Sequence, residues 1–197
     1  MKTGIFGGAF NPVHNGHLAL ARHYIRLLSL DRIIFVPTAL PPHKTSDDLI
    51  DGKDRIAMLN LALGDNKSFL VDDCEFHRTG KSYTVDTLSY LKNKYPDDEF
   101  YLIIGEDQYV CFDKWYKFDE IIKNATVVTA ARHSDKYDEL CEFKKANGFM
   151  QNSIVSDFEV IELSSSQIRK MIFDGDDISG LVPDKVKEYI KENNLYV

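Results

Sequence analysis

Short apolar runs recur along the chain and predict its strands. The clearest runs, Arg32–Pro37 and Glu99–Ile104, are apolar at nearly every position, which is typical of strands covered on both faces of a parallel sheet. With the weaker runs included, we predict strands at 4–6, 32–37, 69–71, 99–104, 125–131 and 160–163.

Between these runs, apolar residues take the three-to-four-residue spacing of amphipathic helices. We predict helices that begin near residues 17, 51, 84, 118, 135, 164 and 183, the last with Pro183 at its first position. Arg55, in the second of them, is interpreted as a residue of the solvated face. Strands that alternate with helices predict an α/β protein with a mainly parallel sheet, which binds its ligands at the carboxyl ends of the strands.

Composition limits the class of protein. With 197 residues, 44% hydrophobic and 28% charged, the chain fits one globular domain over residues 1–197. The net charge of −7 argues against general nucleic-acid binding, which normally needs a basic surface. The cysteines lie far apart and form no Cys-x-x-Cys, as expected in a reducing cytoplasm without a zinc site. No apolar run approaches the 18 residues of a membrane span, so we expect a soluble, cytoplasmic protein.

A glycine-rich stretch joins the first strand to the first helix and gives the strongest indication of chemistry. Gly7 and Gly8 end the strand, an Asn-Pro pair stiffens the turn, and His14 and His17 stand where the helix begins. Unpaired N–H groups and the positive dipole end of a helix favour an anion, so these residues predict a phosphate site. Two alternatives stay open: the histidines could be a metal-ligand pair, although no third ligand lies nearby in sequence, or merely packed side chains.

Further polar groups follow predicted strands or begin predicted helices. Lys44 ends a Pro-Pro-His-Lys loop at the same sheet edge and is either a phosphate ligand or an exposed loop residue. Ser82 and Thr84 begin a helix whose N–H groups suit a carboxylate, unless the two residues only cap it. Gly105 and Asp107 follow the clearest strand, where a carboxylate can accept hydrogen bonds from ribose hydroxyls or cap a helix.

Two basic residues and one aromatic residue complete the candidates. Arg169 follows a serine run, which is an ordinary helix cap, and its guanidinium fork matches phosphate geometry. Arg132 ends the predicted strand at 125–131 and could also reach a phosphate. Trp115 is the only tryptophan, and such a residue usually belongs to a core or covers one.

Together these motifs resemble a known enzyme family. Gly-Gly-x-Phe-x-Pro-x-His-x-Gly-His, from Gly7 to His17, is similar to the signature of the nucleotidylyltransferase superfamily. Ser-Tyr-Thr-x-Asp-Thr-Leu, at 82–88, resembles the segment that holds the nicotinate carboxylate in bacterial nicotinate-nucleotide adenylyltransferases. The Pro-Pro-His-Lys loop and Gly-x-Asp fit the same branch. Its Ile-Ser-Ser-Thr-x-Ile-Arg motif occurs here with Leu163 and Ser166 in place of Ile and Thr.

The resemblance covers nearly the whole chain and implies both fold and site. It implies a Rossmann-like three-layer α/β sandwich with a mainly parallel sheet and a C-terminal helical segment. The implied ATP-binding residues are Gly7, Gly8, Phe10, His14, His17, Gly105, Asp107, Ser165, Ser166 and Arg169. Those implied for the nicotinate nucleotide are Lys44, Ser82, Tyr83, Thr84, Trp115 and Arg132, the last weakly because His133-Ser134 depart from the family pattern. The implied catalytic residues are His14, His17, Lys44 and Arg169.

The implied reaction transfers AMP from ATP to nicotinate mononucleotide and gives nicotinate adenine dinucleotide and pyrophosphate in NAD biosynthesis. The attack on the α-phosphorus would be direct and in line, with no covalent intermediate. Mg²⁺ would accompany ATP, held mainly by phosphates and water, without a protein metal site. We expect small-molecule substrates as the partners, with no nucleic acid and no membrane, and leave a homo-oligomer open. The alternatives are a phosphopantetheine transferase, a non-catalytic nucleotide-binding domain, and a preference for the amide nucleotide.

Overall fold

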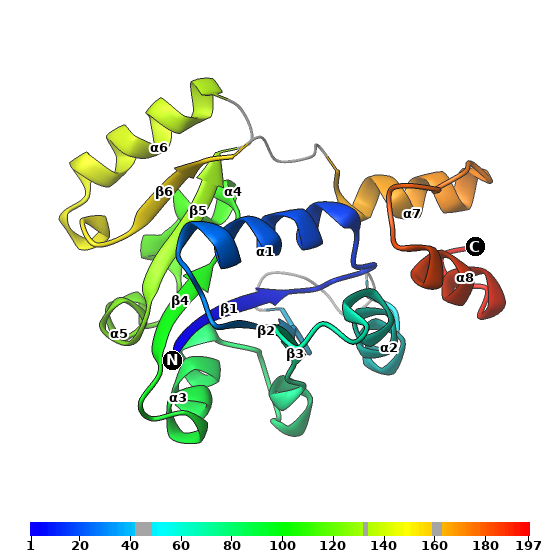
Figure 1. The fold of residues 1–197 in the computed structure, drawn as a ribbon, viewed down its shortest axis with the longest axis horizontal. Helices are drawn as coiled ribbons and strands as arrows, with labels where there is room; N and C mark the ends of the chain where they lie inside the picture. The colour runs from blue at the N-terminus through cyan, green and yellow to red at the C-terminus, as the bar shows by residue number, and fades with distance from the viewer. Residues whose placement is uncertain (42–48, 132–133, 159–162) are drawn as a thin grey trace.

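A single parallel sheet forms the middle layer of the protein (Figure 1). The computed structural model describes residues 1–41, 49–131, 134–158 and 163–197. The six strands run in the order β3-β2-β1-β4-β5-β6, and every neighbouring pair is parallel. Their bounds are β1 Lys2–Gly8, β2 Arg32–Pro37, β3 Phe69–Val71, β4 Glu99–Ile103, β5 Thr126–Ala131 and β6 Ile154–Asp157. The predicted Rossmann-like α/β class is confirmed.

One edge strand escapes the sequence pattern. The prediction of a strand at 160–163 falls mostly on residues outside the described ones. The structure instead shows β6, which pairs with β5 from Ile154 to Asp157. β6 is short and only partly buried, and its second half is polar. It therefore has no apolar run by which it could be recognised.

Helices cover both faces of the sheet (Figure 1). Their bounds are α1 Asn15–Leu27, α2 Gly52–Leu63, α3 Thr84–Lys94, α4 Glu106–Tyr109, α5 Phe118–Asn124, α6 Ser134–Ala146, α7 Ser165–Asp174 and α8 Asp184–Glu192. Single turns of 3₁₀ helix lie at Cys74–His77, Phe112–Lys114 and Gly148–Met150. Pro183 precedes α8 as its N-cap rather than occupying the predicted first helical position.

The two faces of the sheet build two separate cores. Along β1, Ile5 points to one core and Phe6 to the other, because successive strand side chains alternate between faces. The core on the Phe6 side contains residues of α1, α2, α7 and α8. The core on the Ile5 side contains residues of α3, α5 and α6. The nearly all-apolar strands thus follow from burial on both sides.

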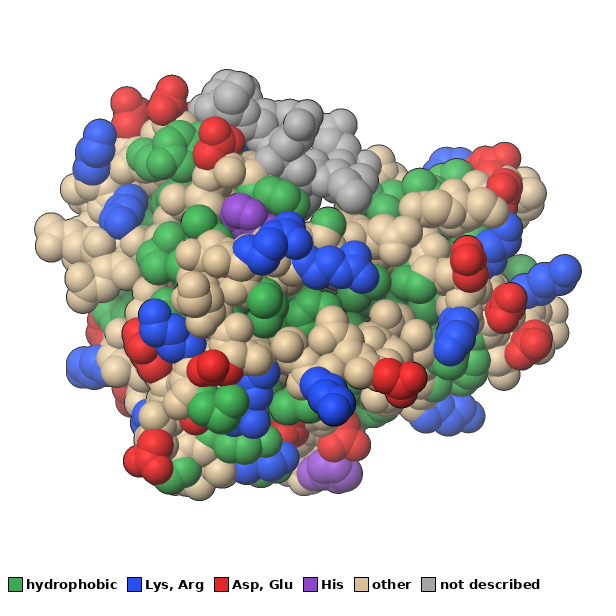
Figure 2. All heavy atoms as spheres, viewed as in Figure 1, with side chains coloured by type: hydrophobic (Ala, Val, Ile, Leu, Met, Phe, Trp, Pro, Cys, Tyr) green, Lys and Arg blue, Asp and Glu red, His purple; other side chains and the backbone are tan. Residues whose placement is uncertain are grey.

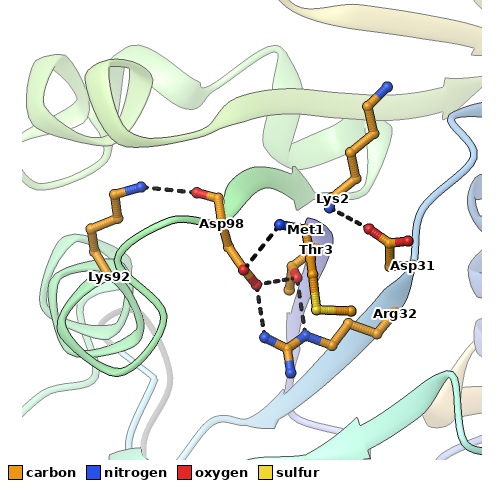
Figure 3. Close-up of polar contacts among 7 residues, drawn as sticks. All are labelled: Met1, Lys2, Thr3, Asp31, Arg32, Lys92 and Asp98. Atoms are coloured by element: carbon orange, nitrogen blue, oxygen red, sulfur yellow. Dashed lines mark hydrogen bonds and ion pairs between the residues drawn. The ribbon is translucent and has the colours of Figure 1, made fainter.

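A buried polar cluster joins the starts of three strands (Figure 3). The Asp98 carboxylate, just before β4, accepts hydrogen bonds from Oγ1 of Thr3 at 2.6 Å and Nη2 of Arg32 at 2.7 Å. The Met1 amine lies 3.3 Å from Oδ1 of Asp98. Burial opposes ionisation of Asp98, but these hydrogen bonds and the Arg32 charge outweigh it and lower the pKa of its carboxyl. The cluster fastens the edge of the sheet opposite the carboxyl ends of the strands.

The outer face of the helical layer that contains α1 is a mixed-charge surface. Acidic and basic side chains are interspersed over it (Figure 2), as is typical of a solvent-facing layer. Among the described residues, no helix combines the length and apolar character needed to cross a membrane.

Candidate active site

The strand order changes direction at β1, and a cavity opens at that point. The chain first builds β1, β2 and β3 outward, then returns to place β4 on the other side of β1. In open α/β sheets, ligands bind at such a switch point, outside the carboxyl ends of the strands. The cavity here has a volume of about 570 Å³. Its floor includes Gly7 and Gly8 of β1, Val36 of β2 and Ile103 of β4.

The glycine-rich loop after β1 is anchored through its carbonyl groups. The carbonyl of Gly8 accepts from the Thr38 N–H at 2.8 Å. Asn11 O accepts from Nη1 of Arg169, and Pro12 O accepts from Oγ of Ser165, both at 2.9 Å. Because these three carbonyl groups accept hydrogen bonds, contacts from α7 and from the loop after β2 hold the glycine-rich loop in place.

The two histidines form one stacked unit at the start of α1. Their ring centroids lie 3.6 Å apart with an interplanar angle of 26°. The His14 backbone N–H donates to Nδ1 of His17 at 3.2 Å, so the proton of a neutral His17 belongs on Nε2. The edge of that ring meets Phe10 at 5.0 Å between centroids. Burial, and then the neighbouring His14, hold the pKa of His17 well below its usual range. His17 is therefore a neutral hydrogen-bond donor.

The start of α3 forms one wall of the cavity, but it is not capped as predicted. Ser82, Tyr83 and Thr84 all line the cavity. Tyr83 occupies the N-cap position, with Thr84 as the first helical residue and no side-chain cap. Ser82 instead pairs with Leu40: its Oγ accepts from the Leu40 N–H at 3.2 Å, and its N–H donates to Leu40 O at 2.9 Å. The alternative that Ser82 and Thr84 cap this helix is therefore wrong.

A buried carboxylate beneath this wall was missed by the sequence analysis. Glu75 lines the cavity, accepts from Oγ1 of Thr87 at 2.7 Å and accepts from the Ala39 N–H at 3.3 Å. Arg78 lies 3.7 Å from the same carboxylate and donates to Thr87 at 2.7 Å. Glu75 thus ties α3 to the loop after β2. Its position after β3, at the carboxyl edge of the sheet, is the signal that could have indicated it.

Aromatic rings form the adjoining wall. Trp115 lines the cavity and is half-buried, with its ring 5.2 Å from that of Phe112. Tyr116 lies 4.6 Å from Tyr83, so the aromatic wall meets the start of α3. Lys81 and Lys114, which the sequence analysis did not single out, also line the cavity. They add positive charge near its mouth.

Gly105 and Asp107 lie at the end of β4. Gly105 is the N-cap of α4 and Asp107 is its second residue, so the alternative that Asp107 caps this helix is wrong. Oδ1 of Asp107 folds back to within 2.7 Å of where a Cβ on Gly105 would lie. Its other oxygen accepts from Nε2 of Gln108 at 3.0 Å. The carboxylate is exposed, and the missing side chain at Gly105 makes room for it.

The serines at the start of α7 have different roles: one caps the helix and another binds the glycine-rich loop. Ser164 is the N-cap and accepts from the Gln167 N–H at 3.2 Å, as the capping alternative predicts. Ser165 is bound to the glycine-rich loop, as described above, and Ser166 accepts from Nη2 of Arg169 at 3.4 Å. Ser166 and Arg169 line a second, open cavity of about 520 Å³ with Tyr196.

The structure brings together most of the predicted site, in two groups. Gly7, Gly8 and Trp115 share the first cavity with the start of α3. Ser165 and Arg169 contact the loop that leads to the two histidines. Lys44 and Arg132 lie outside the described residues. Within those residues, no three or more His, Cys, Asp or Glu gather into a group that could hold a metal ion.

Comparisons with known proteins agree with this geometry. A family model described as cytidylyltransferase-like matches residues 5–171. A probable nicotinate-nucleotide adenylyltransferase of Borreliella burgdorferi is 41% identical over 197 residues, covering 100% of this chain and 97% of the relative. The nicotinate-nucleotide adenylyltransferase of Bacillus subtilis is 38% identical over 195 residues, covering 99% and 98%. The fold matches that of a Plasmodium falciparum nicotinic acid mononucleotide adenylyltransferase complexed with NaAD, with a TM-score of 0.82 at 21% identity, covering 100% and 98%.

Proposed function

The chain belongs to the cytidylyltransferase-like family and, within it, to the nicotinate-nucleotide adenylyltransferases, and we propose that it makes nicotinate adenine dinucleotide for NAD biosynthesis. The AMP moiety of ATP is transferred to nicotinate mononucleotide, and pyrophosphate is released. One observation carries the proposal for this chain: the start of α3 and Trp115 face the same cavity as the glycine-rich end of β1. This shared cavity supports a proposal in which a carboxylate site, an aromatic platform and a phosphate loop act together at one sheet edge.

The acceptor nucleotide occupies the α3 side of the cavity in this proposal. Its pyridine ring stacks on Trp115, since a flat, half-buried ring offers area with few torsions to freeze. Its carboxylate accepts hydrogen bonds from the N–H groups at Thr84, where the dipole of α3 also favours negative charge. A neutral amide gains little from that dipole. Lys81 and Lys114 further favour an anionic substrate.

ATP takes the other side, along the loop from Gly7 to His17. Nε2–H of the neutral His17 donates to a phosphate oxygen, with His14 stacked against it. Arg169 has several guanidinium N–H groups, so it can hold Asn11 O and still reach a phosphate beside Ser166. The exposed Asp107 carboxylate accepts from the ribose hydroxyls. Lys44 and Arg132 remain proposed phosphate ligands.

The chemistry proposed is a single in-line displacement. A phosphate oxygen of the mononucleotide attacks the α-phosphorus of ATP, forming the new P–O bond as the bond to the β-phosphate oxygen breaks and pyrophosphate leaves. The attacking phosphate is already ionised at neutral pH, so no general base is assigned. The residues named here align the two phosphates and neutralise charge as it develops.

We propose that Mg²⁺ enters with ATP. This cation prefers oxygen ligands, usually keeps several waters and is commonly shared with substrate phosphates. The described residues of the site fit that arrangement, since they offer phosphate ligands but no cluster of protein metal ligands. When bound, Mg²⁺ would supply charge neutralisation on the phosphates.

Pyrophosphate release by the purified protein tests the proposal. ATP and Mg²⁺ are supplied with nicotinate mononucleotide, nicotinamide mononucleotide or phosphopantetheine in separate reactions. We expect release with the acid nucleotide far faster than with either other acceptor. Equal release with the amide would remove the role assigned to the start of α3, and release with phosphopantetheine alone would assign a different acceptor. No release with any of them, together with ATP binding, would indicate a nucleotide-binding protein.

A further inference from the structure

Arg55 is a buried cation behind the glycine-rich loop, and the proposed chemistry leaves it without a role. It lies in α2 and is only 2% exposed, which overturns its assignment to a solvated helix face. Its Nη1 donates to Ala9 O at 2.9 Å and to Thr38 O at 2.6 Å. Its Nε donates to Ile50 O at 3.3 Å. One guanidinium therefore bridges the loop after β1 and the loop after β2.

The partners of Arg55 are unusual for a buried charge. Burying a cation is costly unless a counter-charge compensates it, yet within the described residues Arg55 makes no ion pair. All three of its acceptors are backbone carbonyl groups. Burial lowers the pKa of its guanidinium, although Tyr196, Asp51 and Glu75 act in the opposite direction. The hydrogen bonds of Arg55 therefore satisfy carbonyl groups of three loop segments, and two of these segments belong to the site.

The two bridged loops are walls of the proposed site. Gly8 and Ala9 of one loop and Thr38 of the other line the first cavity. A direct backbone bond, from the Thr38 N–H to Gly8 O at 2.8 Å, joins them at the cavity edge. Arg55 adds a second tie one residue further along the first loop. On the other flank, Arg169 holds Asn11 O, so the loop is gripped from both sides.

We propose that Arg55 is a positioning residue for adenylyl transfer, which rests on the function proposed above. Its guanidinium fork fixes the spacing between the glycine-rich loop and the loop after β2. The two walls of the cavity are thereby set at one separation before substrates bind. Both carbonyl groups are bound by Nη1, while Nε holds Ile50 O, so the planar guanidinium fixes where Nη1 points. A lysine keeps the charge but is shorter and has no second nitrogen to anchor its ammonium group.

The test compares Arg55→Lys and Arg55→Met with Arg32→Met. Arg32 is a matched control because it is a partly buried arginine with defined hydrogen bonds, to Thr3 and Asp98, at the opposite sheet edge. Each Tm is measured first, and kinetics are run well below the lowest of them. We expect kcat of Arg55→Lys to fall by roughly 10–100-fold, the scale of a misplacement of about 1 Å, and Arg55→Met to fall at least as far. We expect Arg32→Met to lower Tm and to leave kcat unchanged.

The outcomes separate the possibilities as follows. Wild-type kcat in Arg55→Lys would overturn the proposal, as would an equal loss of kcat in Arg32→Met. If Arg55→Met does not fold, Arg55→Lys, which keeps charge and most of the volume, decides alone. If the wild-type protein turns over no acceptor, the proposed function fails, and amide hydrogen exchange tests the tie itself. Faster exchange at 7–10 and 38–40 in Arg55→Lys but not in Arg32→Met supports it, and unchanged exchange overturns it.

Discussion

Two glycines in β1 offer a pair of matched substitutions with opposite consequences. Gly4 and Gly7 lie in the same strand, but Gly4 is buried between neighbouring strands whereas Gly7 opens onto the cavity. A Cβ on Gly4 would lie 2.8 Å from Cγ1 of Ile33 and 3.0 Å from Cδ1 of Leu30. A Cβ on Gly7 would meet nothing within 4 Å. The space beside Gly7 is therefore open, and it lies at the cavity.

The two alanine variants should separate stability from activity. In Gly4→Ala the added methyl group overpacks the core, which we expect to lower the free energy of unfolding by about 1–2 kcal/mol after the gain from a stiffer unfolded chain. In Gly7→Ala only that gain applies, so stability should rise by about 0.4–1 kcal/mol. Its methyl group would occupy the space through which, in the proposed function, phosphate approaches the backbone. A displacement of about 1 Å corresponds to a loss of about 100-fold in kcat/KM, or roughly 2.7 kcal/mol.

Urea unfolding and pyrophosphate-release kinetics measure the two effects side by side. The expected pattern is an active but less stable Gly4→Ala and a stable but nearly inactive Gly7→Ala. The reasoning would be refuted by a Gly7→Ala protein with wild-type kcat/KM, because substrate would then not approach the end of β1. A Gly7→Ala protein that unfolds more readily than Gly4→Ala would contradict the packing argument.

Three further predictions follow from the site and from the opposite edge of the sheet. His17→Ala should lower kcat by about 100–1,000-fold, the effect of losing one donor to developing charge, with little loss of Tm. Because burial and His14 hold the pKa of His17 well below its usual range, NMR should show a neutral ring at pH 7, and a ring protonated at that pH would contradict this. Trp115→Ala should raise KM for the mononucleotide by stacking worth about 1–3 kcal/mol and spare KM for ATP; the reverse pattern would argue against stacking. Asp98→Asn should lower the free energy of unfolding by about 3 kcal/mol and leave kcat unchanged. Since the folded-state pKa of Asp98 is lowered, the stability it adds is present above the unfolded pKa of about 3.9 and is lost as pH falls through the folded value; acid unfolding that is identical in Asp98→Asn and wild type would contradict this.

Most of the fold follows from apolar patterning, because its strands are buried on both faces. Runs such as 32–37 and 99–104 have no other good explanation in a chain of this composition. β6 could not be recognised from such a run, because it lies at an edge of the sheet and is half polar. The glycine-rich loop and the start of α3 were also recognisable, since each combines a motif with the boundary of an element.

What the sequence could not supply is the set of contacts between distant segments. Ser82 and Thr84 are good helix caps by local preference, but Ser82 instead forms hydrogen bonds with the backbone of Leu40. The role of Glu75 is visible only in its hydrogen bonds with Ala39 and Thr87, which are distant in sequence. Arg55 was assigned to solvent although it precedes Leu59 by four residues and so shares its buried face. The four-residue spacing could have indicated that Arg55 is buried. The sequence does not show which carbonyl groups Arg55 binds.

A competition between acid and amide nucleotides tests the central claim most directly. Nicotinate mononucleotide and nicotinamide mononucleotide are supplied at equal concentration in one reaction with ATP, Mg²⁺ and the wild-type protein. The dinucleotide products are separated by anion exchange and quantified. The account predicts that nicotinate adenine dinucleotide forms in large excess, together with one equivalent of pyrophosphate. A mixture in equal amounts, an excess of the amide dinucleotide, or no dinucleotide at all would contradict it.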